Sequence, residues 1–285
     1  MSSVVFSSGY ADEAESDLSN LSVCAVFKNE SKDLVEWIEY HKMIGVDHFY
    51  LYNVNSSDNY RSVLRRYLRE GTVTLVNWPD FSGDKGPEKE QIWMLGSKLT
   101  AYENAIQFRA KDRTQWLVLL DVNEYLVPDY EEGVLDCLST YHFFDSLKLA
   151  SCVYDAPAVN ESPFKRLKIE SKRLARNPVS SPFVKVTKEI FRPSEYLGFS
   201  WPPYNLRFRE GSQFLSLDTG FVKVNTYVKR NVGSPISDKL ARRINVNRSG
   251  FQPEQVDALL DEDYILEDEG CSACRYVPKL LQRMQ

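Results

Sequence analysis

Long apolar runs, a basic excess and a secretory signal are all missing from this sequence. No run approaches the roughly 18 to 20 apolar residues that a membrane-spanning helix needs. The formal net charge of −5 argues against a general nucleic-acid binder, which normally has an excess of Lys and Arg. Residues 1–20 have no basic segment, and their Ser, Asp and Glu content predicts a disordered leader. We therefore expect a cytoplasmic protein or a luminal piece of a longer one, and basic clusters at 171–176 and 239–243 leave peripheral membrane contact open.

Cysteine and histidine are scarce as well. Five cysteines do not make a disulfide framework in a chain of 285 residues. Cys271 and Cys274 form a lone C-x-x-C pair, and a structural zinc site would need two further ligands in a chain with only three histidines. A reduced pair in a tail is the simpler interpretation. Two N-x-S triplets, at 29–31 and 55–57, fall among residues that we assign below to binding, which favours the cytoplasm over secretion.

The glycine-rich motifs of common nucleotide-binding and hydrolase folds are absent. The sequence contains no G-x-x-x-x-G-K-S/T, no G-x-S-x-G, and no G-x-G-x-x-G after its first predicted strand. The first strand ends in "FKNES", which has no glycine to let the backbone approach a dinucleotide pyrophosphate. An oxidoreductase with a dinucleotide cofactor is therefore disfavoured.

Apolar runs alternate with amphipathic segments through the first half of the chain. Strands are predicted over 22–30, 46–53, 72–79 and 117–120, with helices over 31–44 and 60–70 and a long helix after the polar loop 80–90. A short helix near 133–141 and a strand near 146–154 follow, and the pattern becomes less regular after Asp155. Strands alternating with helices predict parallel pairing and a doubly wound α/β sheet.

The stretch "WLVLLDVNEYLVP", residues 116–128, places polar side chains where a buried strand ends. "LVLL" is apolar on both faces, which is typical of a central strand and puts Asp121 at its carboxyl end, where open α/β sheets bind ligands. In an extended segment Asp121 and Asn123 would point to the same side. Their oxygens predict a site for a divalent cation or for ribose hydroxyls, and the alternative is that both residues cap a turn.

Several motifs together resemble glycosyltransferase family 92. In order along the chain, the motifs are "VCAVFKNESKDLVEWIEYHKMIGVDHFYLYNVNSSDN", "YLREGTVTLVNWP" and "WLVLLDVNEYLVP". The corresponding family pattern has a K-N-E turn, an E-W-I-x-Y-H helix, a Y-D-N-x-S-S-D-N turn and a D-V-D-E-F strand end. The match covers most of residues 22–231. The resemblance implies a GT-A-like (Rossmann-like) fold: a mostly parallel central sheet flanked by helices in a single main domain. It also implies inverting transfer from a UDP-sugar, typically UDP-galactose, usually with Mn²⁺.

The resemblance also suggests which residues bind the nucleotide sugar. The matched positions are Lys28, Asn29 and Glu30 in the first turn, Asp58 in the S-S-D-N turn, Gln91 in the long helix, Asp121 and Asn123 at the D-x-D positions, and Asn225, Tyr227 and Arg230 in "NTYVKR". By the same match Asp121 and Asn123 are the candidate metal ligands.

The departures from the family pattern concern the metal. Asn123 stands where the family has its second acid, and Thr226 replaces a histidine. Either Mn²⁺ binds weakly or the site works without it. A metal would neutralise the leaving diphosphate. We hypothesise that Lys229 and Arg230, with Lys223, take over part of that task.

The base that deprotonates the acceptor has two candidates. Glu124 lies beside the D-x-N, and Asp155 ends the next predicted strand. The structural alternatives are a salt bridge at the strand end for Glu124 and a turn cap for Asp155. Trp201 and Tyr204 in "FSWPPY" are candidates for stacking on an acceptor sugar or for ordinary edge packing.

The sequence thus predicts an inverting hexosyltransferase that takes a UDP-sugar donor and a glycan or lipid-linked glycan acceptor. The alternative is a catalytically weakened or inactive pseudoenzyme that binds a nucleotide sugar or glycan. We expect a leader over 1–20, a glycosyltransferase domain over 21–250, and an acidic helical tail over 251–285. Within the domain, residues 21–130 would bind the nucleotide and residues 131–250 the acceptor.

Overall fold

The computed structural model describes most of the chain between residues 18 and 284. The described residues are 18–81, 93–129, 133–156, 173–174, 188–200, 205–217, 221–229, 266–267 and 272–284. At some of these positions, Asp155 and Lys229 among them, only the backbone is described. None of the described helices combines the length and hydrophobicity that a bilayer crossing requires. The predicted leader and much of the predicted tail lie outside these residues, so the domain boundaries stay predictions.

The N-terminal half forms four parallel strands in the order β3-β2-β1-β4. The strands are β1 (Ser19–Phe27), β2 (His48–Asn53), β3 (Val73–Asn77) and β4 (Thr114–Leu119). The helices are α1 (Ser31–Met43), α2 (Tyr60–Glu70) and α4 (Leu99–Ala105), the last between π-helical segments at Trp93–Lys98 and Ile106–Ala110. Gly71 ends α2 with a φ of 76°, which a glycine adopts without strain. These elements confirm the predicted α/β sheet flanked by helices.

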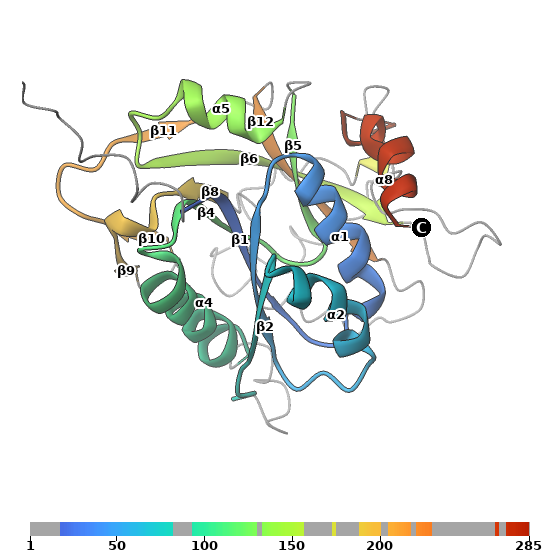
Figure 1. The fold of residues 1–285 in the computed structure, drawn as a ribbon. Helices are drawn as coiled ribbons and strands as arrows, with labels where there is room; N and C mark the ends of the chain where they lie inside the picture. The colour runs from blue at the N-terminus through green and yellow to red at the C-terminus, as the bar shows by residue number, and fades with distance from the viewer. Residues whose placement is uncertain are drawn as a thin grey trace, which may run out of the picture.

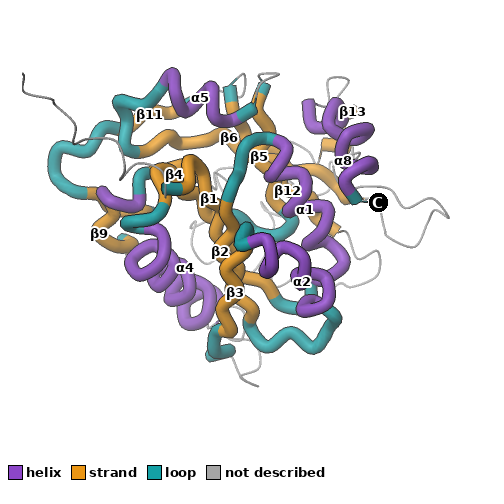
Figure 2. The backbone as a smooth tube through the Cα atoms, viewed as in Figure 1, coloured by secondary structure: helices purple, strands orange, loops and turns teal. Residues whose placement is uncertain are grey.

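Each face of this sheet has its own hydrophobic core, because side chains of a strand point alternately to opposite faces. Val23, Ala25 and Phe27 of β1 pack in the core that includes α1 and α2. Cys24 and Val26 pack in the core that includes α4. Figures 1 and 2 show α1 and α2 on one side of β1 and β2, with α4 on the other. In the described part of the chain both faces of these strands are covered, which leaves the loops at the strand ends as the accessible regions.

The rest of the chain extends the sheet with both antiparallel and parallel pairings. The added elements are β5 (Glu124–Pro128), α5 (Val134–Thr140), β6 (Ser146–Ala156), β7 (Arg173–Leu174), β8 (Lys188–Phe191), β9 (Tyr196–Phe199), β10 (Leu206–Phe208), β11 (Phe214–Ser216), β12 (Val222–Lys229), β13 (Leu266–Glu267) and a 3-10 turn at Pro193–Glu195. β8 lies between β4 and β6 and is antiparallel to both. β12 is parallel to β6 and antiparallel to β5. This register places Asn225 opposite Tyr125 and Thr226 opposite Glu124.

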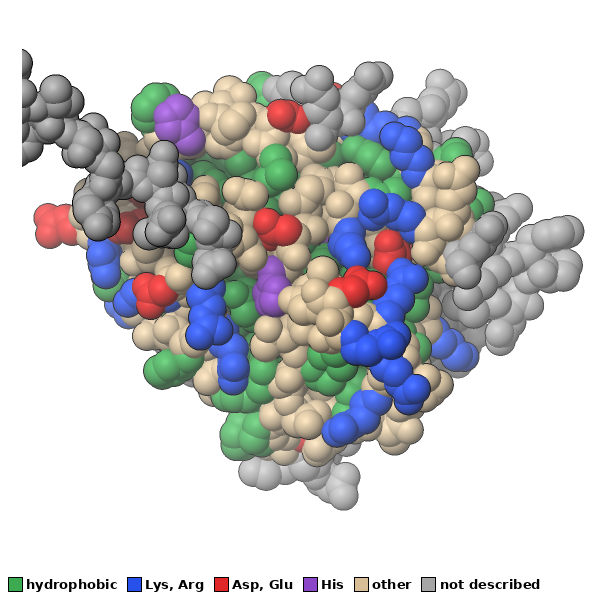
Figure 3. Space-filling view, in the orientation of Figure 1, with side chains coloured by type: hydrophobic (Ala, Val, Ile, Leu, Met, Phe, Trp, Pro, Cys, Tyr) green, Lys and Arg blue, Asp and Glu red, His purple; other side chains and the backbone are tan. Residues whose placement is uncertain are grey.

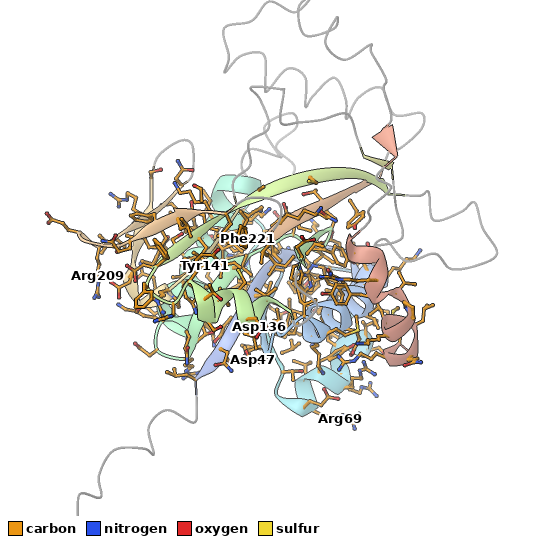
Figure 4. All side chains as sticks on the ribbon, turned by 90° about the horizontal axis from the view of Figure 1, so that it is seen from above. Asp47, Arg69, Asp136, Tyr141, Arg209 and Phe221 are labelled. Carbon is orange, nitrogen blue, oxygen red and sulfur yellow. The ribbon has the colours of Figure 1, made fainter. Side chains whose placement is uncertain are left out.

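The segment between β5 and β6 packs against the sheet and the end of α1. The rings of Tyr141 and Phe221 meet edge to face with centroids 5.9 Å apart, and Figure 4 labels both. Val134 N donates to Ile44 O at 2.9 Å. Gly133 precedes α5 with a φ of 105°, and a Cβ there would lie 2.8 Å from Ile44 O. A side chain at 133 would therefore push α5 away from α1.

The C-terminal helix α8 (Val277–Arg283), which follows a 3-10 turn at Ser272–Tyr276, packs beside α1. Leu280 is fully buried, and the Tyr276 ring lies 5.4 Å from that of Tyr40. Arg283 lies 3.7 Å from Glu39 of α1. In Figure 3, Lys and Arg side chains gather on the side of α1, α2 and α8, where α2 exposes Arg61, Arg65, Arg66 and Arg69.

The stretch 116–128 turns at Asp121 and Asn123, which was the alternative to an extended segment. It forms two strands, because β4 ends at Leu119 and β5 begins at Glu124. Glu124 N donates to Asp121 O at 2.9 Å, which closes a turn over residues 121–124. Leu120 and Val122 stay fully buried, so the sequence keeps its apolar pattern through the turn. The alternation of an extended strand therefore does not apply to Asp121 and Asn123.

Candidate functional site

The loops after β1 and β2 are joined by hydrogen bonds at the carboxyl ends of these strands. Asn29 and Asn55 have φ angles of 58° and 50°, a left-handed conformation that Asn tolerates better than most residues. Asn29 N donates to Ser56 Oγ at 2.9 Å, and Ser57 N donates to Asn29 Oδ1 at 2.8 Å. The K-N-E turn and the S-S-D-N turn, 27 residues apart at this bond, therefore form one structural unit.

Three other predicted binding residues lie in the same unit. Ser31 N donates to Asp58 Oδ2 at 2.7 Å, so the Asp58 carboxylate caps the first turn of α1 from the neighbouring loop. Lys28 forms an ion pair with Asp80, in the loop after β3, at 2.7 Å. The carbonyl oxygen of Glu30 accepts the first backbone hydrogen bonds of α1. The structure thus brings Lys28, Asn29, Glu30 and Asp58 together.

Asp121 follows β4 and forms an ion pair with Lys98, at the end of the π-helical segment before α4. Tyr102 OH donates to Asp121 Oδ1 at 3.4 Å. Burial opposes ionisation of Asp121, but Lys98 and Lys188 outweigh it and lower the pKa of this carboxyl below its usual value. The Asp121 side chain keeps 35% of its surface exposed. It is therefore ionised and within reach of a ligand.

Glu124 begins β5 and completes a group of four charged side chains, which we call the lysine–carboxylate cluster: Lys98, Asp121, Glu124 and Lys188. The Glu124 carboxylate accepts from Asp121 N and pairs with Lys188, both at 2.8 Å. Its side chain is only 8% exposed, and burial raises the pKa of Glu124. The salt bridge at the strand end considered above is thus present. The role of Glu124 as the base stays a prediction.

The residues of β12 hold the turn from the other side. Asn123 Nδ2 donates to Tyr227 O at 3.2 Å, and Tyr227 N donates to Asn123 O at 2.8 Å. Asn225 is buried, and its Nδ2 donates to Tyr227 OH at 3.3 Å. Asn225 Oδ1 and Tyr125 OH are buried without a hydrogen-bond partner. The structure therefore places Asn123, Asn225 and Tyr227 together, beside the lysine–carboxylate cluster.

The E-W-I-x-Y-H segment of α1 holds the backbone of β5. Trp37 Nε1 donates to Glu124 O at 2.8 Å, and Tyr40 OH donates to Leu126 O at 2.8 Å. His41 Nδ1 lies 2.8 Å from Trp37 O, and Leu126 N donates to His41 Nε2 at 3.3 Å. Burial lowers the pKa of His41 to about 3, so the ring is neutral and accepts through Nε2. This segment of α1 fixes the position of Glu124 through hydrogen bonds to the backbone of β5.

Five of these residues were given no role by the sequence. Lys98 and Lys188 have no local signal, because a lysine on a helix or strand is ordinarily exposed. Trp37, Tyr40 and His41 contributed to the family resemblance. The helical spacing of Trp37 and His41 on an apolar face indicated burial alone.

Other predicted residues lie outside the described structure. These are Gln91, Arg230, Trp201 and Tyr204. For Asp155 and Lys229 only the backbone is described, and Asp155 is paired with Val228 between β6 and β12. Their predicted roles stay predictions.

The two candidate metal ligands do not converge on a common point. The Asp121 carboxylate is paired with Lys98, whereas the Asn123 amide donates to the backbone of β12. Among the described residues, no three His, Cys, Asp or Glu side chains gather as metal ligands would. A site for Mn²⁺ normally supplies several oxygen ligands. The residues that the structure describes here do not fit such an ion.

Comparison with known proteins gives both a family and distant structural likenesses. The model of glycosyltransferase family 92 matches residues 19–245. A glycosyltransferase family 92 protein of Oryza sativa subsp. japonica is 25% identical over 83% of this chain and 38% of its own length. A second, from Ricinus communis, is 21% identical over 82% of this chain and 40% of its own. The chain thus spans about two fifths of these curated relatives.

Solved structures with a similar arrangement include two from bacteria. S. aureus TarS (residues 1–349) has a TM-score of 0.40 and 13% identity, over 85% of this chain and 69% of that one. Glucosyl-3-phosphoglycerate synthase from Mycobacterium tuberculosis, in complex with Mn²⁺, UDP-glucose and phosphoglyceric acid, has a TM-score of 0.40 and 14% identity, over 82% and 81% of the two chains. The family match covers most of the present sequence, including every described residue from β1 to β12. The chain belongs to glycosyltransferase family 92.

Proposed function

We propose that this chain transfers a hexose, galactose in the first place, from a UDP-sugar to a glycan or glycoconjugate acceptor with inversion at the anomeric carbon. The observation that carries the proposal is the position of Asp121. It is ionised and partly exposed at the end of β4, on the edge of the sheet where the loops after β1 and β2 are joined. Open α/β sheets bind nucleotides at this edge.

In this proposal Asp121 accepts a hydrogen bond from a ribose hydroxyl of UDP. Its partly exposed side chain and its ionised state suit that role. Glu124 or Asp155 takes the acceptor proton. Burial raises the pKa of Glu124, and a raised pKa makes a carboxylate a better proton acceptor near neutral pH, which supports Glu124.

The test is UDP affinity measured by calorimetry, with Asp121→Asn as the variant. Loss of a charge-assisted hydrogen bond should weaken UDP binding by about 10- to 100-fold. Asp112→Asn is the matched control, since Asp112 is exposed just before the opposite end of the same strand. It should bind UDP like the parent protein. Undiminished UDP binding by a folded Asp121→Asn protein would refute the proposed site.

A second candidate function is a pseudoenzyme that binds the donor without transferring the sugar. The hydrogen bond from Asn123 to β12 and the ion pair of Glu124 with Lys188 favour the pseudoenzyme, because both side chains make structural contacts. Release of UDP from UDP-galactose and UDP-glucose, with and without sugar acceptors, separates the two. Binding without UDP release supports the pseudoenzyme. The cytoplasmic location and the lipid-linked acceptor stay predictions.

A further inference from the structure

The lysine–carboxylate cluster is balanced without a metal ion. Lys98 pairs with Asp121, and Lys188 pairs with Glu124 at 2.8 Å. The Lys98 and Lys188 side chains are 11% and 16% exposed, so both ammonium groups lie in the protein rather than in bulk solvent. Glu124 and then Asp121 raise the pKa of Lys188 against the effect of burial, which keeps it charged. Two buried positive charges therefore face two carboxylates.

The net charge of the lysine–carboxylate cluster equals that of a divalent cation held by two carboxylates. Two lysines contribute +2, the charge of one such cation, and Asp121 and Glu124 contribute −2. A divalent ion added to this cluster would have to displace Lys98 from Asp121 and leave its ammonium buried without a partner. Burying an unpaired charge is strongly unfavourable. The cluster therefore disfavours the metal that the family resemblance implied.

Asn123 is matched to this arrangement. Its Nδ2 donates to Tyr227 O, a bond that a carboxylate cannot make because it has no N–H. An Asp at this position would instead place a negative charge against the carbonyl oxygen of Tyr227. The residue that departs from the D-x-D pattern thus serves as a cross-link between the turn and β12.

We infer that the ammonium group of Lys98, supported by Lys188, takes the place of a divalent cation at Asp121, and that this chain binds its nucleoside diphosphate without a metal. The inference rests on the proposed function, since it concerns the same UDP site. Its carrying observation is the contact between Lys98 and the one partly exposed carboxylate of the cluster.

The chemistry assigned to Lys98 is charge stabilisation. During transfer, the acceptor oxygen forms a bond to the anomeric carbon, and the bond from that carbon to the diphosphate oxygen breaks. The electron pair leaves with the diphosphate, and the acceptor proton passes to the base. Lys98 donates a hydrogen bond to the departing diphosphate and transfers no proton. Such fixed donors lower the energy of the charge that develops in the transition state.

The first experiment measures UDP affinity by calorimetry in EDTA and in Mn²⁺, with Mn²⁺ binding followed by electron paramagnetic resonance in the presence of UDP. We expect the UDP affinity to be the same in both solutions, within about twofold. Adding the protein should leave the intensity of the Mn²⁺ signal unchanged. Binding of UDP only with Mn²⁺ would overturn the inference and leave the proposed function standing. Absence of UDP binding in both solutions would overturn both.

The second experiment compares Lys98→Met, Lys98→Arg and the control Lys111→Met. Lys111 follows the helical segment Ile106–Ala110 and comes just before the start of β4. The cluster lies at the other end of this strand. Lys98→Met should weaken UDP binding in EDTA about 10- to 100-fold, while Lys98→Arg keeps most of the affinity because it keeps the charge. Lys111→Met should match the parent protein. A Lys98→Met protein with a normal melting curve and unchanged UDP affinity would contradict the inference, and so would loss of binding in Lys98→Arg.

Discussion

His41 should lower the free energy of unfolding in acid at pH values well above the pKa of its ring in the native protein. The ring is fully buried among Trp37, Tyr40 and Tyr125, none of which is charged at neutral pH. Its Nε2 accepts a hydrogen bond from Leu126 N. Protonation would turn this acceptor into a donor facing another donor, in an environment without a compensating carboxylate. Burial accordingly lowers the pKa of His41 from 6.5 to about 3.

The magnitude follows from linkage between proton binding and folding. Between pH 6.5 and about 3 the unfolded chain binds a proton at His41 and the native protein does not. The free energy of unfolding therefore falls by about 1.4 kcal/mol for each pH unit of acidification in this window. From pH 7 to pH 5, His41 alone should remove about 2 kcal/mol of stability. The loss begins near the unfolded pKa and grows as the pH falls.

The assay is urea unfolding at pH 7 and pH 5, followed by tryptophan fluorescence, for the parent protein and His41→Gln. The Gln side chain carries a carbonyl oxygen that can accept from Leu126 N, and it does not titrate. His41→Gln should lose about 2 kcal/mol less than the parent over this pH range. His142→Gln, at an exposed histidine, should behave like the parent protein. Equal losses in His41→Gln and the parent would refute the reasoning, as would an imidazole at 41 that titrates near 6.5 in the folded protein.

Two further predictions concern turns, and both are measured by urea unfolding at pH 7. Gly71→Ala should cost about 1 kcal/mol, because its φ is 76° but nothing lies within 4 Å of the added Cβ. Gly133→Ala should cost about 1–3 kcal/mol more, because its Cβ would lie 2.8 Å from a backbone oxygen, and equal costs would contradict the proposed clash. Asp58→Ala should cost about 1 kcal/mol through loss of the cap on α1, and Asp58→Asn less, since it keeps an acceptor. An Asp58→Asn protein as unstable as Asp58→Ala would argue against capping.

The first half of the fold was predictable because its signals are local. Strands such as β1 are apolar on both faces, and α2 carries a periodic apolar face that ends at Gly71. The position of Asp121 after a central strand followed from the same pattern. The sequence left the turn at residues 121–124 as an alternative to an extended segment, because Leu120 and Val122 are apolar and buried as in a continuous strand.

The sequence by itself determined the order of the N-terminal elements, the position of Asp121 after a central strand, and the resemblance to the family. Only the tertiary structure decided which charges meet at Asp121. A whole helix separates Lys98 from Asp121 in the sequence. Lys188 lies on β8, which comes much later in the chain and pairs with β4. Hydrophobic periodicity reports which face of an element is buried. It does not report the partner of a buried charge, because that partner is set by how distant elements pack together.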